Sequence, residues 1–385
     1  MPMGNIIKHA EAILRAYEIE PKPLDRLIDA YYRRNRNLGP KERRLISDAV
    51  FGVMRWKRRL DGILQLEGID RPTHRQRIAA YIEGKLKVEP QMKRFPGGLA
   101  AYWSFPDFIY DRLVGYKGEE WAAKVASAVN EEAWLVIRAN TLKIDRSGLQ
   151  KILKGEGVES RPTDRSPFGL ILEERMNLNS LESFKKGLFE VQDEASQLIG
   201  LLVDPKKNEI IIDACAGAGG KTLLMAMLMN GEGKIVASDT NIRKLKTLKE
   251  RAKQAGAKNI EVVLPHKLKD YYRESADAVL IDVPCTGTGT LRRNPDLKWR
   301  LSEGDISNCV KTQKEILSDS LLLVKRGGRL IYVTCSILPD ENEDVAGWFQ
   351  KKYSWELTGD YFRTDPSSES MDGFFAAVFR RPEKA

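Results

Sequence analysis

Apolar residues recur every three or four positions through the first third of the chain, which is the spacing of one buried helix face. One such series comprises Ile6, Ala10, Ile13, Leu14 and Tyr17, and similar series follow over 24–31 and 45–53. Prolines and glycines at 21, 39–40, 72 and 96–97 interrupt these series and separate the predicted helices. Residues 1–130 are therefore predicted to form an all-α domain.

The pattern changes after residue 130. Residues 131–185 contain two strand-like runs, "WLVIRANTL" and "FGLILE", around a helical pattern at 147–154, and this predicts a small α+β subdomain. From residue 186 onward, short apolar runs alternate with helical patterns at 221–229, 241–255 and 305–324. The predicted strands are 209–213, 234–238, 260–264, 278–283, 329–334 and 374–379. Apolar strands that alternate with helices predict a Rossmann-like α/β domain over 186–385, with a doubly wound, mostly parallel sheet covered on both faces.

Composition narrows the class of protein. The 385 residues are 42% hydrophobic and 30% charged, the balance of a water-soluble globular protein. No run approaches the ~18 apolar residues of a membrane span, and the first residues do not resemble a signal peptide. The four cysteines contain no CxxC pair, so neither a metal site nor a disulfide framework is predicted. We expect a cytoplasmic protein that does not bind membranes.

The positive charge is concentrated in one segment. The formal net charge is +9, and residues 31–60 alone hold ten Lys and Arg against two Asp and Glu. Tyr31, Tyr32 and Trp56 lie in the same segment, which suits binding to nucleic-acid phosphates with rings available to stack on bases. A solvated helical face whose acidic partners lie elsewhere would give the same composition.

A glycine-rich loop follows the first strand of the predicted sheet. In "DACAGAGGKT" (213–222), three glycines let the backbone turn tightly and approach a ligand at the start of the next helix. A Walker A phosphate loop would need a glycine at 215, where the chain has cysteine. The second strand is followed by Asp239, which can accept both hydroxyls of a ribose or cap the next helix. Both NAD and S-adenosylmethionine carry such a ribose, and the lack of a full GxGxxG or a hydride-transfer site favours S-adenosylmethionine.

Two cysteines come directly after predicted strands, Cys285 in "LIDVPCTG" and Cys335 in "LIYVTCS". The carboxyl ends of strands in a doubly wound sheet share one edge, where ligands bind. Both cysteines are therefore predicted to face the cofactor crevice, together with Cys215, Asp239 and Asp282. Cys309 lies within a helical pattern and is expected to be a core residue.

A thiol beside a methyl donor suits methylation of a pyrimidine at carbon 5. Addition of a thiolate to carbon 6 makes carbon 5 nucleophilic enough to attack the methyl group, and expulsion of the thiol restores the ring. An acid near ring nitrogen 3 would donate a proton as charge builds, and Asp282 is the candidate. Lys221 and the positive end of a helix would favour the thiolate. This chemistry does not choose between Cys285 and Cys335 as the nucleophile.

Several stretches resemble the RNA cytosine-C5 methyltransferases of the Sun/Fmu type, most closely the bacterial 16S ribosomal RNA enzymes. In the family's order they are "FEVQDEAS", "DACAGAGGKT", "SDTNIRKL", "LIDVPCTGTGTLRRNPDLKWR", "YVTCSILPDENE" and "DGFFAAVF". The stretch "LGPKERRLISDAVFGVMRWKRRLDGIL" resembles the family's NusB-like helical domain. "WLVIRANTL" resembles the strand that opens its small RNA-recognition subdomain. The resemblance implies a NusB-like RNA-binding domain at 1–130, an RNA-recognition subdomain at 131–185 and a methyltransferase domain at 186–385.

The resemblance also implies roles for individual residues. Cys335, in the "TC" motif, is implied to be the nucleophile, and Cys285, in the "PC" motif, to help release the product. Asp282 is implied to lie near the methyl group and the target base. The implied contacts of S-adenosylmethionine are Cys215, Ala216, Gly217, Ala218, Gly219, Gly220, Lys221, Asp239, Arg243 and Asp282.

The chain departs from the family pattern at two places. The family's loop reads Ala-Pro where this chain has Gly217 and Ala218. The family also places an acid after the third strand to hold the adenine amine, whereas this chain reads "LPHK" over 264–267. His266 either substitutes for that acid or is a solvated loop residue.

The resemblance implies methylation of carbon 5 of a cytosine in RNA, with ribosomal RNA favoured over transfer RNA, and we expect a monomer. A non-catalytic RNA-binding assembly factor that retains the fold is one alternative, against which the intact Cys335, Cys285 and Asp282 argue. A DNA cytosine-C5 methyltransferase, in which the "PC" cysteine is the nucleophile, is another. The "TC" motif and the helical N-terminal domain argue against that second alternative.

Overall fold

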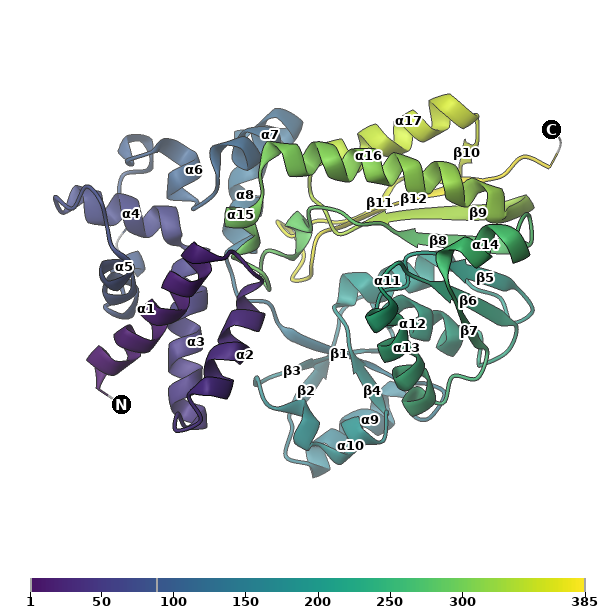
Figure 1. Ribbon diagram of the computed structural model, residues 1–385, viewed down its shortest axis with the longest axis horizontal. Coiled ribbons are helices and arrows are strands. Elements are labelled where there is room, and N and C mark those ends of the chain that lie inside the picture. Colours follow the sequence, from purple (N-terminus) through teal and green to yellow (C-terminus); the bar gives the residue numbers. More distant parts are fainter. Residues whose placement is uncertain (1, 88, 384–385) are drawn as a thin grey trace. The chain divides into compact units, whose positions relative to one another are not determined.

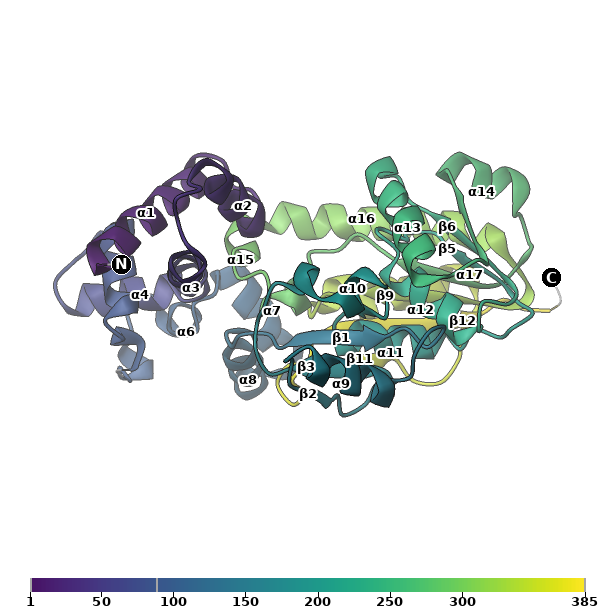
Figure 2. The same cartoon turned by 90° about the horizontal axis from the view of Figure 1, so that it is seen from below.

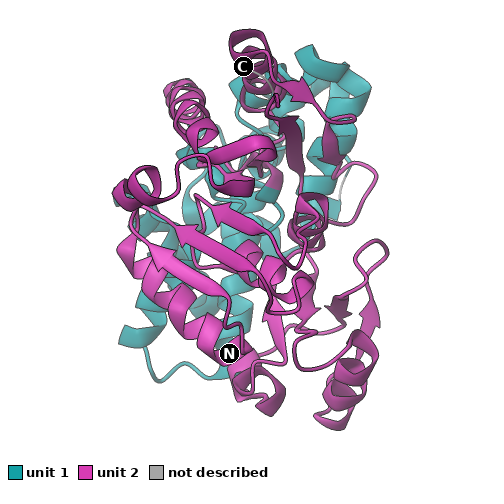
Figure 3. Ribbon diagram, turned by 90° about the vertical axis from the view of Figure 1, so that its right-hand side faces the viewer, with its two compact units in different colours: residues 1–132, 290–303 teal, residues 133–289, 304–385 magenta. Residues whose placement is uncertain are grey.

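The computed structural model describes residues 2–87 and 89–383, which divide into two compact units (Figure 3). The first unit comprises residues 1–132 and 290–303, and the second comprises residues 133–289 and 304–385. Within the described residues, no helix combines the length and apolar character that crossing a bilayer requires.

The first unit is helical, as the apolar spacing predicted. Residues at the predicted spacing in the first helix are all buried, and Leu24, Ile28, Ile46 and Val50 extend the same core. The helices are α1 (Met3–Ile19), α2 (Leu24–Arg34), α3 (Pro40–Arg55), α4 (Lys57–Leu66), α5 (His74–Ile82), α6 (Gly98–Tyr102), α7 (Asp107–Lys117), α8 (Glu119–Val129) and α15 (Leu297–Arg300), with short 3₁₀ turns η1 (Lys85–Lys87) and η2 (Met92–Arg94).

A segment from the second half of the chain, residues 290–303, packs inside this helical unit. Lys298 is 1% exposed, and its side-chain nitrogen donates to the carbonyls of Arg55 and Ser104 and to the side-chain oxygen of Asn130, at 2.8–2.9 Å. Burial lowers the pKa of Lys298. The structure thus groups this segment with the helices rather than with the residues that flank it, while the three-domain division stays a prediction.

The second unit begins with a small antiparallel sheet in the order β2-β3-β1-β4. Figure 2 shows β1, β2 and β3 of this sheet with α9 beside them. The sheet's apolar face is covered by α9 and α10, through residues such as Ile137, Leu153 and Phe189. The elements are β1 (Leu135–Ala139), α9 (Arg146–Gly155), β2 (Ser160–Pro162), β3 (Gly169–Leu172), η3 (Leu178–Ser180), α10 (Glu182–Lys185) and β4 (Phe189–Val191). The sequence pattern predicted β1, α9 and β3, and did not predict the two short strands at the edges.

A larger, mostly parallel sheet follows in the order β10-β12-β9-β8-β5-β6-β7, with β11 paired to β12, and it confirms the predicted fold class. The strands are β5 (Ile210–Asp213), β6 (Lys234–Ser238), β7 (Ile260–Val263), β8 (Ala276–Asp282), β9 (Val324–Thr334), β10 (Glu356–Leu357), β11 (Phe362–Thr364) and β12 (Phe374–Arg380). β5 to β9 pair in parallel, whereas β12 runs antiparallel to β9.

Helices cover both faces of this sheet, which explains its continuous apolar strands. One face packs against α11, α12 and α13, and the other against α14, α16 and α17. Figure 1 shows α16 and α17 on one side of the strands and α11 to α13 on the other. The helices are α11 (Glu194–Val203), α12 (Gly220–Leu228), α13 (Ile242–Ala255), α14 (Pro265–Tyr271), α16 (Glu303–Ser320) and α17 (Glu343–Tyr353), with 3₁₀ turns η4 (Thr288–Thr290), η5 (Leu321–Leu323) and η6 (Pro339–Glu341).

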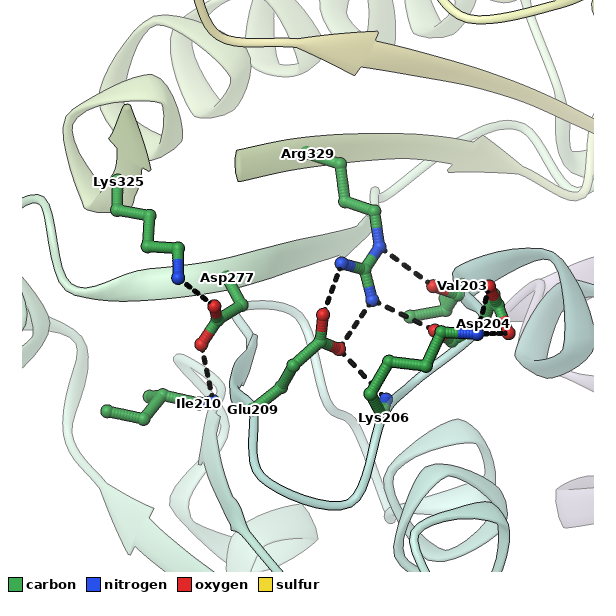
Figure 4. A network of polar contacts seen from close by, with 8 residues as sticks. All are labelled: Val203, Asp204, Lys206, Glu209, Ile210, Asp277, Lys325 and Arg329. Atoms are coloured by element: carbon green, nitrogen blue, oxygen red, sulfur yellow. Dashed lines mark hydrogen bonds and ion pairs between the residues drawn. The ribbon is translucent and has the colours of Figure 1, made fainter. Parts of the chain in front are cut away.

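Ion pairs join the elements at the amino ends of β5 and β8 (Figure 4). The Arg329 guanidinium donates to both carboxylate oxygens of Glu209, at 2.7 and 2.8 Å, and to the carbonyls of Val203 and Asp204. Asp277 pairs with Lys325 and accepts from the backbone of β5. The polar groups at this edge bind one another, so the opposite edge is the one available for a site.

Candidate active site

The carboxyl ends of the parallel strands bring several predicted site residues to one edge of the large sheet. β8 lies between β5 and β9, and its last residue, Asp282, is in register with Val333 of β9. β5 ends at Asp213 and β6 at Ser238 on the same side, because these strands run parallel. The loops that follow meet at the position where doubly wound sheets bind ligands. They carry Cys215, Asp239, Cys285 and Cys335.

The structure places the Sγ atoms of Cys285 and Cys335 3.3 Å apart. Both thiols are free and half-buried. The backbone joins their loops, because the N–H of Gly289 donates to the Cys335 carbonyl at 2.9 Å. A Cβ on Gly289 would lie 1.9 Å from the carbonyl oxygen of Gly373, so this approach requires glycine. A substrate carbon bonded to one sulfur would lie within reach of the other.

Cys285 is held as a neutral thiol. Its hydrogen bond with Cys335 raises the pKa of Cys285, and burial and the charges of Glu341 and Asp282 raise it further. A neutral thiol can donate a hydrogen bond, which a thiolate cannot.

Lys221, at the start of α12, forms an ion pair with Asp282 across 2.7 Å. Burial by itself would lower the pKa of Lys221, but the charge of Asp282 and their hydrogen bond outweigh it, so the pKa is raised. Cys335 in its charged form contributes to this increase, which places its sulfur within electrostatic reach of the ammonium. The ammonium also lies 4.9 Å from the ring centre of Phe374. Lys221 is thus a buried cation that is held by Asp282 and lies within electrostatic reach of Cys335.

The glycine loop turns into α12 through two glycines with positive φ. Gly219 has φ +89°, and a Cβ there would lie 2.6 Å from Cγ of Leu248. Gly217 has φ +55°, and nothing lies within 4 Å of the position of its missing Cβ. Ala216 donates its N–H to the carbonyl of Ser238 in β6. The loop therefore packs tightly at Gly219 and leaves open space at Gly217, where a ligand can approach the backbone.

Asp239 connects this loop to α13. One carboxylate oxygen accepts from Gly217 N–H at 2.8 Å, and the other accepts from Asn241 N–H at 2.7 Å. Asn241, rather than Asp239, caps α13. Each oxygen of Asp239 has a further lone pair, so the carboxylate can also accept from two ribose hydroxyls.

Burial raises the pKa of two further groups beside the glycine loop, Asp213 and Cys215. It raises the pKa of Asp213 to about 7, although a hydrogen bond of 2.7 Å from the hydroxyl of Thr222 acts to lower it. It also raises the pKa of Cys215, with the charge of Asp213 adding to the effect. Cys215 is therefore an unreactive thiol that forms part of the loop's packing.

The structure does not bring two other predicted residues, Arg243 and His266, into the glycine loop. The side chain of Arg243 is exposed on the first turn of α13, and among the described residues no hydrogen bond or ion pair joins it to the glycine loop. His266 is exposed in the first turn of α14, beside Leu264, which is 36% exposed. Cys309, expected in the core, is only half-buried in α16.

Three charged side chains support the site, two of them buried and Arg251 half-buried, and the sequence pattern did not reveal them. Arg138, from β1, donates to the carbonyl of Gly220 at 3.0 Å. Arg251, from α13, donates to the carbonyl of Ala218 at 2.5 Å. Glu341, from η6, binds the loops of both catalytic cysteine candidates. Charged residues are expected on protein surfaces, so the sequence pattern did not indicate that these three side chains contact the site.

The basic segment 31–60 is only partly exposed. Arg33, Arg34, Arg36, Lys41 and Arg44 are exposed around the turn between α2 and α3. Four basic residues further along make internal contacts instead: Arg55, Lys57, Arg58 and Arg59.

The aromatic rings of this segment are engaged within the helical unit. The hydroxyl of Tyr32 bonds to Arg43 and Ser47, Tyr31 bonds to His9, and Trp56 packs against the core. These rings are partly buried by helix packing, and their stacking on bases stays a prediction.

Two family models match the chain. A model described as "16S rRNA methyltransferase RsmB/F" matches residues 200–380, and one described as "Methyltr_RsmF/B-like, ferredoxin-like domain" matches residues 105–179.

The chain is also similar to individual proteins over most of its length. The probable ribosomal RNA small subunit methyltransferase B of Synechocystis sp. is 27% identical over 412 residues, which cover 89% of this chain and 92% of that protein. The 28S rRNA (cytosine-C(5))-methyltransferase of Mus musculus is 30% identical over 331 residues, which cover 78% of this chain and 41% of that protein. Among solved structures, that of PH0851 matches with a TM-score of 0.82 at 27% identity, covering 99% of both chains.

Proposed function

The chain belongs to the Sun/Fmu-type family of RNA cytosine-C5 methyltransferases, and we propose that it transfers a methyl group from S-adenosylmethionine to carbon 5 of a cytosine in 16S ribosomal RNA. The observation that carries the proposal is the pair of sulfurs of Cys285 and Cys335, 3.3 Å apart at the edge that carries the glycine loop. Methylation at carbon 5 requires one group to attack carbon 6 and a means of releasing it afterwards.

The residues at this edge fit S-adenosylmethionine, which supplies an electrophilic methyl group when bound. Open space at Gly217 admits a ligand to the loop backbone, and Asp239 has lone pairs for ribose hydroxyls. Residues 215–221, with Asp239 and Asp282, would hold the cofactor. The exposed Arg243 stays a predicted contact.

Cys335 is the proposed nucleophile. Its thiolate adds to carbon 6 of the flipped cytosine, and the electron pair of the double bond makes carbon 5 nucleophilic. The Asp282 carboxylate takes a proton from the Lys221 ammonium, to which it is hydrogen-bonded, and passes it to ring nitrogen 3 as charge builds there. The same ammonium favours the thiolate before attack. Carbon 5 then forms its bond to the methyl group.

Cys285 is proposed to assist release. Loss of the carbon-5 proton to solvent, and return of the nitrogen-3 proton to Asp282, restores the ring double bond and breaks the bond between carbon 6 and Cys335. The neutral Cys285 thiol lies within hydrogen-bonding distance of the departing sulfur, so it can stabilise the thiolate as it forms.

The exposed basic residues between α2 and α3 are proposed to bind RNA phosphates. They lie around one turn of the helical unit and are exposed, so a polyanion can reach them. The proposal extends to a monomer that acts in the cytoplasm. Light scattering on the purified protein, alone and with RNA, tests the monomer.

The test is transfer of tritiated methyl groups to RNA extracted from cells that lack the gene. Purified protein should label the small-subunit ribosomal RNA, and bisulfite sequencing should locate the label at a cytosine. Labelling confined to transfer RNA would identify a different substrate. No labelling of any RNA, with S-adenosylmethionine shown to bind, would overturn the proposed function.

A further inference from the structure

Glu341 is a fully buried carboxylate that the proposed reaction does not use. It lies at the end of η6, six residues after Cys335, and it is 0% exposed. Its side-chain partners in the described part of the chain are neutral: Thr286, Ser336 and Gln313. A buried carboxylate held only by neutral donors is costly unless its hydrogen bonds are complete. Such a group is retained where its geometry serves a purpose.

One set of these bonds fixes the loop of Cys285. The Thr286 N–H donates to Oε1 of Glu341 at 2.8 Å, and the Thr286 hydroxyl donates to Oε2 at 2.5 Å. On the other side of the cysteine, Gln313 donates to the carbonyl of Pro284 at 3.0 Å and to Oε1 of Glu341 at 2.9 Å. The backbone is thus held immediately before and immediately after Cys285.

The other set fixes the loop of Cys335. The Ser336 hydroxyl donates to Oε2 of Glu341 at 2.6 Å. Tyr332, in β9, donates its hydroxyl to the backbone carbonyl of Glu341 at 2.5 Å, which ties η6 to the strand that precedes the cysteine. A single carboxylate therefore bridges the residue after Cys285 and the residue after Cys335.

The charge of Glu341 also reaches the cysteines. It contributes to the raised pKa of Cys285, after the hydrogen bond with Cys335 and burial. This effect keeps Cys285 protonated while its partner attacks. Glu341 thus binds both cysteine loops, and its charge helps to raise the pKa of Cys285.

We propose that Glu341 is a positioning residue that sets the separation of the Cys285 and Cys335 sulfurs and, through it, the rate of the covalent steps. The inference rests on the proposed function, since it concerns the two cysteines of that reaction. It adds a residue to which neither the motifs nor the reaction assigned a role.

The experiment compares Glu341→Ala and Glu341→Gln with wild type, all in a Cys309→Ala background. Glutamine keeps one carbonyl acceptor, and its amide can donate to the hydroxyls of Thr286 and Ser336 acting as acceptors, so it should preserve the bridge. Asp344→Asn is the matched control, because it removes an exposed carboxylate three residues away. Dibromobimane, which becomes fluorescent when it links two thiols, reports sulfur proximity without RNA or cofactor. Cys335→Ala gives the background signal.

We expect Glu341→Ala to lower both the bimane linking rate and kcat by roughly 10- to 100-fold, with KM for RNA and S-adenosylmethionine within about threefold of wild type. Glu341→Gln and Asp344→Asn should stay within about fivefold of wild type in both assays. If Glu341→Ala fails to fold, Thr286→Val removes one hydroxyl donor at constant volume and should lower both rates several-fold. Wild-type linking and kcat in a folded Glu341→Ala or Thr286→Val variant would overturn the proposal.

The two proposals fail separately. A wild-type protein that methylates no RNA would refute the proposed function, while the bimane rates would still decide whether Glu341 sets the sulfur separation. A protein that methylates RNA and tolerates Glu341→Ala would refute only the positioning role.

Discussion

The Lys221–Asp282 ion pair predicts an asymmetric response to the removal of either charge. The Lys221 side chain is 10% exposed and that of Asp282 is 30% exposed, across a distance of 2.7 Å. Asp282→Asn leaves a buried ammonium with no counter-charge, and a cost of about 3–5 kcal/mol in the free energy of unfolding follows from buried pairs that lose one partner. Lys221→Met leaves a carboxylate that water can reach, so we expect a cost of about 1–2 kcal/mol. Both variants should lose methyl transfer.

The double variant tests the reasoning. Lys221→Met/Asp282→Asn removes both charges and places a thioether beside the Phe374 ring, so its stability should lie within about 1 kcal/mol of wild type. Equilibrium urea unfolding followed by circular dichroism gives the four free energies of the cycle. The exposed pair Lys207–Glu232 is the matched control, and its coupling should be below about 1 kcal/mol. The account would be refuted if the stability losses of the two single variants added up in the double variant, or if Lys221→Met lost more stability than Asp282→Asn.

Three further predictions concern the loop and the surface. Burial raises the pKa of Asp213 to about 7, so between about pH 4 and 7 this group binds more protons in the folded than in the unfolded protein, and its contribution to stability falls as the pH rises. Asp213→Asn should therefore gain stability relative to wild type above pH 7 in urea titrations. A stability difference between the two proteins that is the same at pH 4 and pH 8 would contradict this. Gly219→Ala should lose about 1–3 kcal/mol of stability, because of φ +89° and the contact with Leu248, and Gly217→Ala should lose less than half as much in the same thermal unfolding assay. The exposed arginines are Arg33, Arg34, Arg36 and Arg44. Neutralising them should weaken RNA binding at every sequence and flatten its salt dependence, as measured by fluorescence anisotropy. Neutralising the buried arginines should instead unfold the helical unit.

Much of the fold follows from apolar periodicity. The run 234–238 coincides with β6, and the predicted end of β8 lies one residue from the observed end at Asp282. The placement of Cys285 and Cys335 at one edge required only the strand ends and the parallel topology. The antiparallel direction of β12 was not predictable, since an apolar run is the same read in either direction.

The site's supporting groups were less accessible to sequence reasoning. Glu341 and Arg138 are buried charges, and periodicity treats charge as a sign of exposure. The same assumption overestimated the basic surface, because Arg55 and Arg59 bond internally. The 3.3 Å separation of the cysteine sulfurs depends on the loop contacts that Glu341 makes, which no local pattern encodes.

The assignment of the two cysteines is tested most directly by trapping the covalent protein–RNA adduct on denaturing gels. Wild type, Cys335→Ala and Cys285→Ala are incubated with S-adenosylmethionine and ribosomal RNA from cells that lack the gene. We predict that Cys285→Ala accumulates an adduct that survives denaturation and disappears on RNase treatment, and that Cys335→Ala forms neither adduct nor methylated RNA. Methylation by Cys335→Ala, or an adduct that forms without Cys335, would contradict the account.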